Sequence, residues 1–278
     1  MPIVLPFFLL LLIHAGVGHS GAPESVELPL PPRAPGAMSG SAFIVSLAGT
    51  TLTQREARIR EQFEAGNIPE FQRRLRRIDA TATIGGIEQT IHFYASPDYL
   101  MIGSDADHVR LPITPILGRQ LANHVGGVFP TRAMVNMVHR RADYHLAPQP
   151  IAPSPEMTTL PVFVQHHQLV ETQRTNAGIA TGRMLTGIKK DIVTTPLIAT
   201  RPTPRVAIFG WHQLNNVPIQ NLSTVHGESY VDYSHGFRHI HGQAWVGGTW
   251  VPIRSLWSDP VRHVFLSDEG AFTDPYTP

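Results

Sequence analysis

Residues 80–95, Ala-Thr-Ala-Thr-Ile-Gly-Gly-Ile-Glu-Gln-Thr-Ile-His-Phe-Tyr-Ala, carry the clearest structural pattern in the chain. Two segments of alternating apolar and polar residues, 80–84 and 87–95, flank the glycine pair at 85–86. Such alternation is typical of strands with one buried face, and a glycine pair favours the tight turn of a β-hairpin. The sequence therefore predicts a hairpin here, followed by a third short strand at 99–102.

Helical patterns lie on both sides of this hairpin. Thr53 and Glu56 have the spacing of a capping box, and the amphipathic stretch that follows ends at Gly66. A second helix is expected from Pro69 through Ile78, which would complete a helical hairpin. Further helices are expected at 114–125, 130–138 and 162–174.

The last third of the chain changes to short apolar segments that are typical of strands. They lie at 192–195, 206–209, 244–246 and 249–253, and glycines at 247–248 join the last two. The expected fold class is α+β, with a helix-rich N-terminal half and a β-rich C-terminal half around one core.

The N-terminal region has the pattern of an exported protein. An apolar run at 3–13 is followed by small residues, which predicts a signal peptide over residues 1–20; an uncleaved tail or a buried strand is the alternative. The Pro- and Gly-rich residues 21–41 are expected to form a linker without a core of its own. Residues 42–278 are then a single α+β domain, with a potential subdivision at the Pro-rich stretch 146–161. The expected location is secreted or periplasmic.

The composition excludes several classes of protein. The 278 residues include 22 Lys and Arg, 21 Asp and Glu and no Cys, for a formal net charge of +1 at pH 7. Because there is no basic block, we expect no nucleic acid as a partner. Because there is no Cys, disulfides, thiolate metal sites and thiol nucleophiles are excluded. No second apolar run approaches membrane length, so we expect no membrane span after signal removal.

Chemically competent side chains concentrate in the back half. Five of the 15 histidines fall between residues 212 and 241, among carboxylates, hydroxyls and aromatic residues. Any one of these could be structural, but their density favours a functional site. The candidate catalytic residues are Asp191, His212, His226, Tyr230, Asp232, Ser234 and His235. The candidate substrate-binding residues are Lys190, Trp211, Gln220 and Arg238.

Two chemistries fit this cluster. Its imidazoles and carboxylates could converge on a divalent metal that keeps one position open for water, which leaves the cofactor undecided. Alternatively His235, held in one tautomer by Asp232 or Asp191, acts without a metal as a general base toward a water or a hydroxyl such as that of Ser234.

Several strings resemble a known group of sequences. Residues 187–193, 206–212 and Tyr230-Val231-Asp232-Tyr233-Ser234-His235-Gly236 resemble a family of uncharacterised secreted bacterial proteins that carry a Tyr-x-Asp-Tyr-Ser-His-Gly motif. The likeness covers most of the chain after residue 45 and implies an exported domain. Residues 190–193 and 234–237 are similar, more weakly, to strands of the NlpC/P60 cell-wall peptidases. Those enzymes use a Cys nucleophile, which this chain lacks, so the resemblance points only to a cell-wall-like substrate.

These observations lead to two hypotheses. The first is an exported hydrolase that acts on an amide or glycosidic bond of an extracellular or cell-wall polymer or peptide through a His/Asp site. The second is a non-catalytic envelope or carbohydrate- or peptide-binding module. A catalytic site predicts a perturbed titrating group in a concave pocket, whereas a binding groove predicts a row of aromatic side chains such as Trp211, Trp245 and Trp250.

Overall fold

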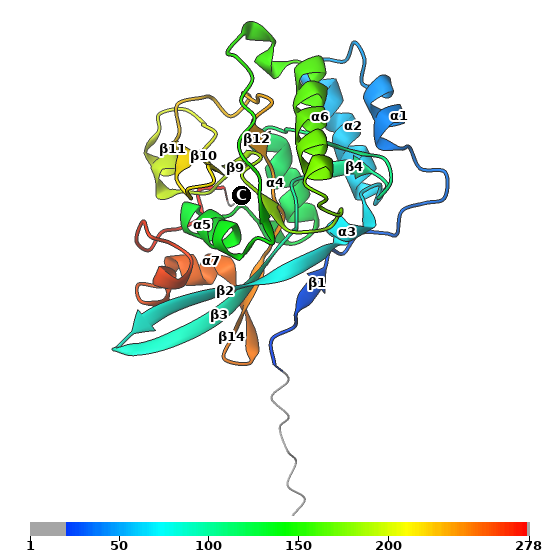
Figure 1. The fold of residues 1–278 in the computed structure, drawn as a ribbon. Helices are drawn as coiled ribbons and strands as arrows, with labels where there is room; N and C mark the ends of the chain where they lie inside the picture. The colour runs from blue at the N-terminus through cyan, green and yellow to red at the C-terminus, as the bar shows by residue number, and fades with distance from the viewer. Residues whose placement is uncertain (1–20, 277–278) are drawn as a thin grey trace, which may run out of the picture.

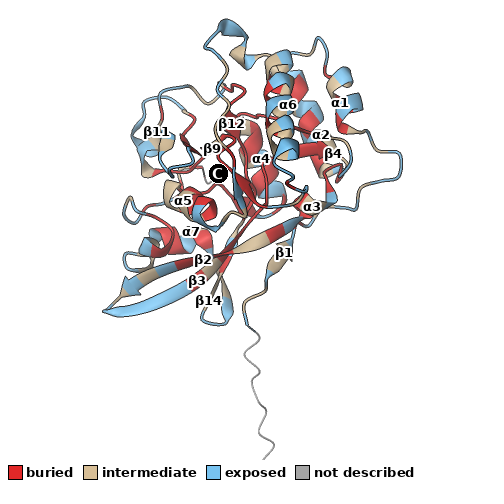
Figure 2. Cartoon of the chain, in the orientation of Figure 1, coloured by how far each residue is buried: buried red, intermediate tan, exposed pale blue. Residues whose placement is uncertain are grey.

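The fold is α+β, as the sequence predicts. The computed structural model describes residues 21–276, so the expected signal peptide over residues 1–20 lies outside the described residues. Helices α1 (Gly40–Ser46), α2 (Leu52–Glu64) and α6 (Leu160–Asn176) lie at one end of the molecule, and a long hairpin of β2 (Arg74–Ile84) and β3 (Ile87–Ala95) extends at the other (Figure 1). Exposed residues gather at the tip of the hairpin, and buried residues concentrate between the two ends (Figure 2). No helix within the described part is long and apolar enough to cross a membrane.

The predicted hairpin is confirmed and is longer than expected. Strands β2 (Arg74–Ile84) and β3 (Ile87–Ala95) pair antiparallel, and the turn glycines have φ of +59° and +80°. The helix expected from Pro69 through Ile78 is wrong, because α3 (Glu70–Arg73) stops after four residues. Leu75 packs in one hydrophobic cluster while Ile78 packs in another, so β2 buries opposite faces at its two ends. The three-residue spacing of Leu75 and Ile78 is also the spacing of residues on one face of a helix, which explains the wrong prediction.

The hairpin forms the centre of a seven-stranded sheet that draws on both halves of the chain. The strand order is β1-β2-β3-β13-β6, and β14 pairs with both β3 and β15. The added strands are β1 (Ser25–Glu27), β6 (Gly127–Val128), β13 (Ile240–His241), β14 (Gln243–Val246) and β15 (Thr249–Pro252). The two strands predicted around the 247–248 turn are thus confirmed.

A second, four-stranded sheet has the order β11-β10-β9-β12. Its strands are β9 (Lys190–Ile192), β10 (Ile208–His212), β11 (Pro218–Ser223) and β12 (His235–Gly236). Strand β12 runs parallel to β9, whereas the other pairs are antiparallel. Two smaller pairs are β4 (Met101–Gly103) with β5 (His108–Arg110), and β7 (Tyr144–His145) with β8 (Leu185–Thr186).

Four helices lie close to their expected positions: α2 (Leu52–Glu64), α4 (Pro115–His124), α5 (Arg132–Arg141) and α6 (Leu160–Asn176). Helices α1 (Gly40–Ser46) and α7 (Ile253–Ser258) were not predicted. Thr114 and Thr131 cap α4 and α5, as their Thr/Pro pairs predict. The capping box of α2 is formed by Thr51 and Gln54 instead of Thr53 and Glu56. Glu56 instead accepts hydrogen bonds from Thr114.

Residues 21–41 are not a free linker. Strand β1 pairs with β2, and Leu28 is buried in the core beneath it. Tyr94 Oη donates to the carbonyl of Pro23 at 2.9 Å. The prediction overlooked the alternating apolar residues Val26, Leu28 and Leu30, which give this proline-rich segment a face to bury.

The Pro-rich stretch 146–161 packs against the second sheet. Tyr233 Oη donates to the carbonyl of Ile151 at 3.0 Å and accepts from its N–H at 2.7 Å. The N–H of Tyr233 donates to the carbonyl of Met157 at 3.0 Å. This stretch therefore covers the side of the sheet next to the Asp232–His235 turn.

Candidate functional site

The parallel pairing of β9 with β12 brings two of the predicted strings together. His235 lies opposite Lys190, and Gly236 lies opposite Asp191. Residues paired in this way share a face of the sheet, and successive residues point to opposite faces. Lys190 and His235 therefore share one face and Asp191 lies on the other, so the single predicted cluster divides in two.

The first part, which we call the His235 group, is organised by the Asp232 carboxylate. The group comprises His226, Tyr230, Asp232, Ser234 and His235, with Lys190 across the strand pair. Ser234 donates to Asp232 Oδ1 from its N–H at 2.7 Å and from its hydroxyl at 2.5 Å, which is the local turn that an Asp two residues earlier favours. Tyr230 Oη donates to Asp232 Oδ2 at 3.2 Å, and His235 Nε2 lies 3.8 Å from the same oxygen.

The His235 imidazole is buried and has unused hydrogen-bonding capacity. Its side chain is 0% exposed, and neither ring nitrogen has a hydrogen-bond partner among residues 21–276. Few buried polar atoms in folded proteins are left in this state. Tyr230 meets the ring edge-on at 5.7 Å, and the exposed His226 stacks on Tyr230 at 4.1 Å. Two aromatic rings thus separate His235 from solvent.

Electrostatics set the charges of this pair. Burial lowers the pKa of His235 to about 4, against the attraction of Asp232. Burial alone would raise the pKa of Asp232, but the charge of His235 and the hydrogen bonds from Ser234 outweigh it and hold that pKa below its usual value. At neutral pH the pair is therefore a carboxylate beside a neutral imidazole, which is the protonation state of a general base.

Lys190 and Trp211 lie next to this pair. The Lys190 ammonium is 5.5 Å from the centre of the Trp211 ring, and burial lowers the pKa of Lys190 against the attraction of Asp232. Trp211 is itself buried and packs against Tyr233, with φ of +55°. The position of Trp211 makes it a wall of the site.

The second part, the Asp191 group, comprises Tyr99, Asp191 and Arg238. Tyr99 Oη donates to Asp191 Oδ2 at 2.8 Å, and Arg238 Nε lies 3.7 Å from Oδ1. Arg238 Nη1 donates to the carbonyl of Ser96 at 2.6 Å, and Arg238 Nη2 donates to the carbonyl of Leu185 at 2.8 Å. Burial raises the pKa of Asp191 to about 6. The structure thus places Arg238, which we expected to bind substrate, in the interior, where it joins separate backbone segments.

Gly236 is required where these two parts meet. A Cβ atom at this position would lie 2.4 Å from the Tyr99 ring and 2.8 Å from Lys189 Cβ. Real Cβ atoms do not approach other atoms so closely, so the glycine of the motif allows Tyr99 to lie flat against β12.

His212 and Gln220 lie apart from the His235 group. His212 Nε2 is 2.9 Å from Asn136 Oδ1, and its ring stacks on His139 of α5 at 4.2 Å. Burial lowers the pKa of His212 to about 4. Gln220 Nε2 donates to the carbonyl of Asn221 on the same strand. The prediction that His212 acts together with His226 and His235 therefore has no support in these contacts.

Sequence reasoning missed Lys189 and His166. Lys189 is buried, donates to the carbonyl of Tyr233, and has its pKa lowered to about 7 by burial. With Asp191, Trp211 and other residues it lines a cavity of about 10 Å³, room for one water molecule. His166 of α6 is also buried with both ring nitrogens unbonded, 5.0 Å from the Tyr233 ring. Of the two adjacent lysines in a strand-like string, one had to point inward, which was the available signal for Lys189.

The described residues do not favour a metal centre. Within residues 21–276, no three or more His, Asp or Glu side chains are grouped so that they could hold a metal ion. The divalent metal that the sequence allowed therefore lacks a ligand set in this part of the chain.

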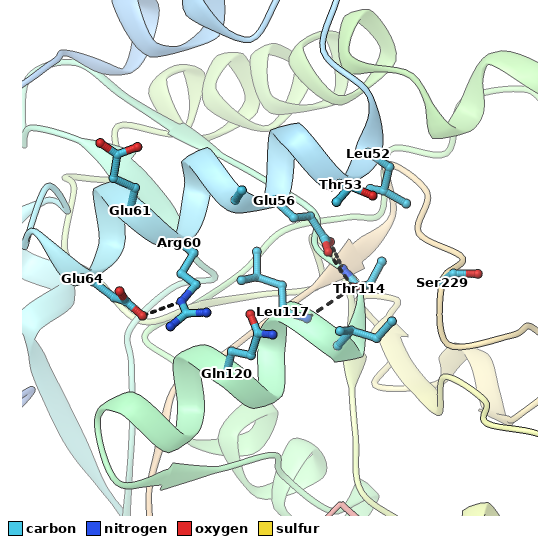
Figure 3. Close-up of a pocket in the computed structure, with 12 residues that line it drawn as sticks. Leu52, Thr53, Glu56, Arg60, Glu61, Glu64, Thr114, Leu117, Gln120 and Ser229 are labelled. Atoms are coloured by element: carbon cyan, nitrogen blue, oxygen red, sulfur yellow. Dashed lines mark hydrogen bonds and ion pairs between the residues drawn. The ribbon is translucent and has the colours of Figure 1, made fainter.

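An open groove runs between α2 and α4 beside the His235 group (Figure 3). Its volume is about 530 Å³, and Glu56, Leu117 and Gln120 line its floor and walls, with Ser229 at one end. Ser229 precedes Tyr230 in the chain. Leu52, at the same end as Ser229 (Figure 3), also packs against the cluster that contains Trp211 and Tyr233. The groove therefore leads to the loop that covers His235.

Comparisons of the chain with protein-family models, with curated proteins and with solved structures find no match. The resemblance to secreted bacterial proteins that share the Tyr-x-Asp-Tyr-Ser-His-Gly motif therefore stays a prediction.

Proposed function

We propose that the protein is an exported hydrolase that acts on an amide or glycosidic bond of an extracellular or cell-wall polymer. The observation that carries this proposal is the His235 imidazole, which is buried with neither nitrogen bonded and lies 3.8 Å from the Asp232 carboxylate. His166 and His239 are buried in the same unbonded state, but of these three histidines only His235 lies within 4 Å of a carboxylate among the described residues. A general base needs a nitrogen lone pair available for a proton, and a nearby carboxylate stabilises the imidazolium that forms.

The chemistry requires no group beyond those of the His235 group and a water molecule. Neutral His235 takes a proton from the water as its oxygen attacks the carbon of the scissile bond. Asp232 stabilises the imidazolium, which then gives the proton to the leaving nitrogen or oxygen. The Lys190 ammonium is the nearby cation that can stabilise negative charge on the substrate oxygen. Tyr230 and Ser234 hold the carboxylate in place through their hydrogen bonds.

Access to His235 depends on the Thr224–Tyr230 loop. Tyr230 covers the imidazole and His226 covers Tyr230, while Ser229 forms the end of the α2–α4 groove. A polymer lying in the groove would reach His235 when the Tyr230 ring turns aside. Movement of a loop over an active site shields the reaction from water in many enzymes.

The alternative of a binding module depends on an aromatic row, and the tryptophans are placed differently. Trp245 and Trp250 form an edge-to-face pair at 5.2 Å in the first sheet, where Trp250 also contacts Tyr94. Trp211 lies in a separate hydrophobic cluster with Tyr233. The three rings do not line one groove, so this arrangement favours the hydrolase.

The test is release of soluble products from purified cell walls, followed by mass spectrometry. Wild type should release fragments, and His235→Ala should reduce the rate by about 10²–10⁴, which is the usual effect of removing a general base. His92→Ala is a matched control, because His92 is also paired with an aspartate, Asp79, at 2.8 Å on the hairpin. Equal rates for wild type and His235→Ala, or no release by wild type, would overturn the proposal.

A further inference from the structure

A second cavity, of about 700 Å³, lies along α4 and has a basic lining; Gln120 lines both this cavity and the α2–α4 groove. It is bounded by α4, by the segment 198–205 and by Pro275 and Tyr276. Among the described residues, three arginines, Arg119, Arg201 and Arg205, line it together with a single carboxylate, Glu228. The chain as a whole is nearly neutral, so this local excess of positive charge is a feature of the cavity.

Each arginine is held in position by one polar contact. Arg201 Nε donates to Thr224 Oγ1 at 2.7 Å, and Arg205 Nη1 donates to the carbonyl of Val225 at 2.8 Å. A guanidinium has five N–H donors, so both side chains keep donors for a ligand after these bonds among the described residues. Fixing a guanidinium beforehand reduces the entropy lost when it binds an anion.

Arg119 is shared between the cavity and Glu228. Its Nη2 donates to Glu228 Oε2 at 3.0 Å, and its guanidinium stacks on the Tyr276 ring at 5.1 Å. The Tyr276 hydroxyl donates to the carbonyl of Arg205 at 3.2 Å, so one tyrosine supports two of the arginines. Asp274, the next carboxylate along this segment, is paired with Arg254 at 2.9 Å. Within residues 21–276, Glu228 is therefore the one acidic competitor in the lining.

We infer that this cavity binds an oxyanion, a carboxylate or a phosphate, that is attached to a partly apolar ligand. Guanidinium groups recognise both oxyanions through paired hydrogen bonds. The apolar walls are supplied by Ile198, Pro202, Pro204 and Tyr276. The site is separate from the His235 group and its inference does not depend on catalysis.

The cavity and the proposed hydrolytic site share one loop. Arg201 and Arg205 hold Thr224 and Val225, the N–H of Val206 donates to the carbonyl of His226 at 3.1 Å, and Arg119 holds Glu228. Tyr230 ends the same loop. An anion that displaces Glu228 from Arg119 therefore acts on the segment that covers His235.

The test is calorimetric titration of the protein with phenyl phosphate, with benzoate and with neutral benzamide. We expect one or both anions to bind and benzamide not to bind, and the stronger anion identifies phosphate or carboxylate as the preferred group. Arg201→Gln and Arg205→Gln keep a donor for the loop but lose the charge, and each should weaken anion binding at least about tenfold. Arg141→Ala, an exposed arginine on α5, is the matched control.

Two results would overturn the inference. One is binding of benzamide as tight as that of the anions, and the other is unchanged anion affinity in both glutamine variants. Glu228→Gln removes the competitor and should tighten binding, with no change counting against the role of Arg119. Because the readout is binding, these results are distinct from a failure of the cell-wall assay.

Discussion

Two buried aspartates, Asp191 on β9 and Asp232 in the turn before β12, behave differently. Asp232 receives hydrogen bonds from Ser234 and Tyr230, has a lowered pKa and lies beside an imidazole with no bonds of its own. Asp191 receives one bond from Tyr99, has a pKa raised to about 6, and lies beside an arginine whose donors are spent on backbone carbonyls. Burial and shifted pKa values are common to both groups. The His235 group differs in that an imidazole with unused hydrogen-bonding capacity lies 3.8 Å from a carboxylate; His166 and His239 have the same unused capacity, but neither has a carboxylate within 4 Å among the described residues.

The largest expected difference between the two aspartates is in turnover. Asp232→Asn removes the charge that stabilises the His235 imidazolium and should lower the rate of cell-wall hydrolysis by about 10²–10⁴. Asp191→Asn keeps an acceptor for Tyr99 and should turn over at the wild-type rate. Equal losses of hydrolysis rate in the two variants would show that Asp232 and Asp191 do not have different roles.

The reverse order is expected for stability. Arg238→Ala leaves Asp191 without its charged neighbour and frees the carbonyls of Ser96 and Leu185, so the free energy of unfolding should fall by about 3–5 kcal/mol in a urea titration. His235→Ala removes no hydrogen bond made by the ring, and loss of its two unsatisfied nitrogens offsets part of the cost of the cavity, so it should cost less than Arg238→Ala. A stability loss larger for His235→Ala than for Arg238→Ala would contradict our assignment of the framework.

The two groups also predict opposite pH dependence of stability. For His235 the folded-state pKa of about 4 lies below the unfolded value of about 6.5, so the unfolded state binds more protons between these values and stability falls as the pH drops. For Asp191 the folded-state pKa of about 6 lies above the unfolded value of about 3.9, so stability falls as the pH rises through this range.

Seven histidines with a lowered pKa act against Asp191, whose pKa is raised. The melting temperature should therefore rise from pH 4 to pH 6.5. Burial lowers the pKa of His108, His139, His166, His167, His212, His235 and His239. Asp191→Asn should make the rise steeper, because it removes the opposing group, and His212→Gln should make it shallower. A melting temperature that falls over this range would show that these histidines are charged in the folded state.

The smallest expected effect sharpens the role of Ser234. Ser234→Ala removes a hydroxyl that donates to Asp232 at 2.5 Å, which leaves more negative charge facing His235. The apparent pKa of the pair on the acidic side of the pH–rate profile should therefore move to higher pH. Ser223→Ala, on β11, provides a serine control; a shift of equal size there would remove the specific role of Ser234.

The parts of the fold and site that the sequence predicted are those decided by neighbours in the chain. The hairpin follows from its glycine turn, and α4 and α5 follow from their Thr caps. The His235 group likewise lies within one short turn, from His226 to His235. Local spacing was sufficient because the hydrogen bonds span only two residues.

The parts that were wrong depend on distant partners. Asp191 meets Tyr99 from 92 positions away, and His212 meets Asn136 from 76 positions away, so sequence spacing could not place them. The docking of residues 21–41 depends on pairing with β2, and β2 was itself mistaken at its start for a helix. Period-2 alternation also sends Lys190 and Asp191 to opposite faces, which a list of nearby residues does not convey.

Nuclear magnetic resonance titration of the His235 imidazole is the most direct test of whether His235 is a neutral base, because it requires no substrate. The signal is assigned by its absence in His235→Ala. We expect a neutral ring at pH 7 that takes up a proton only near pH 4. The pKa of the ring should be lower still in Asp232→Asn and unchanged in Asp191→Asn. A ring that is already protonated at pH 7 would make Asp232 and His235 an ordinary buried ion pair and would contradict the assignment of His235 as the base.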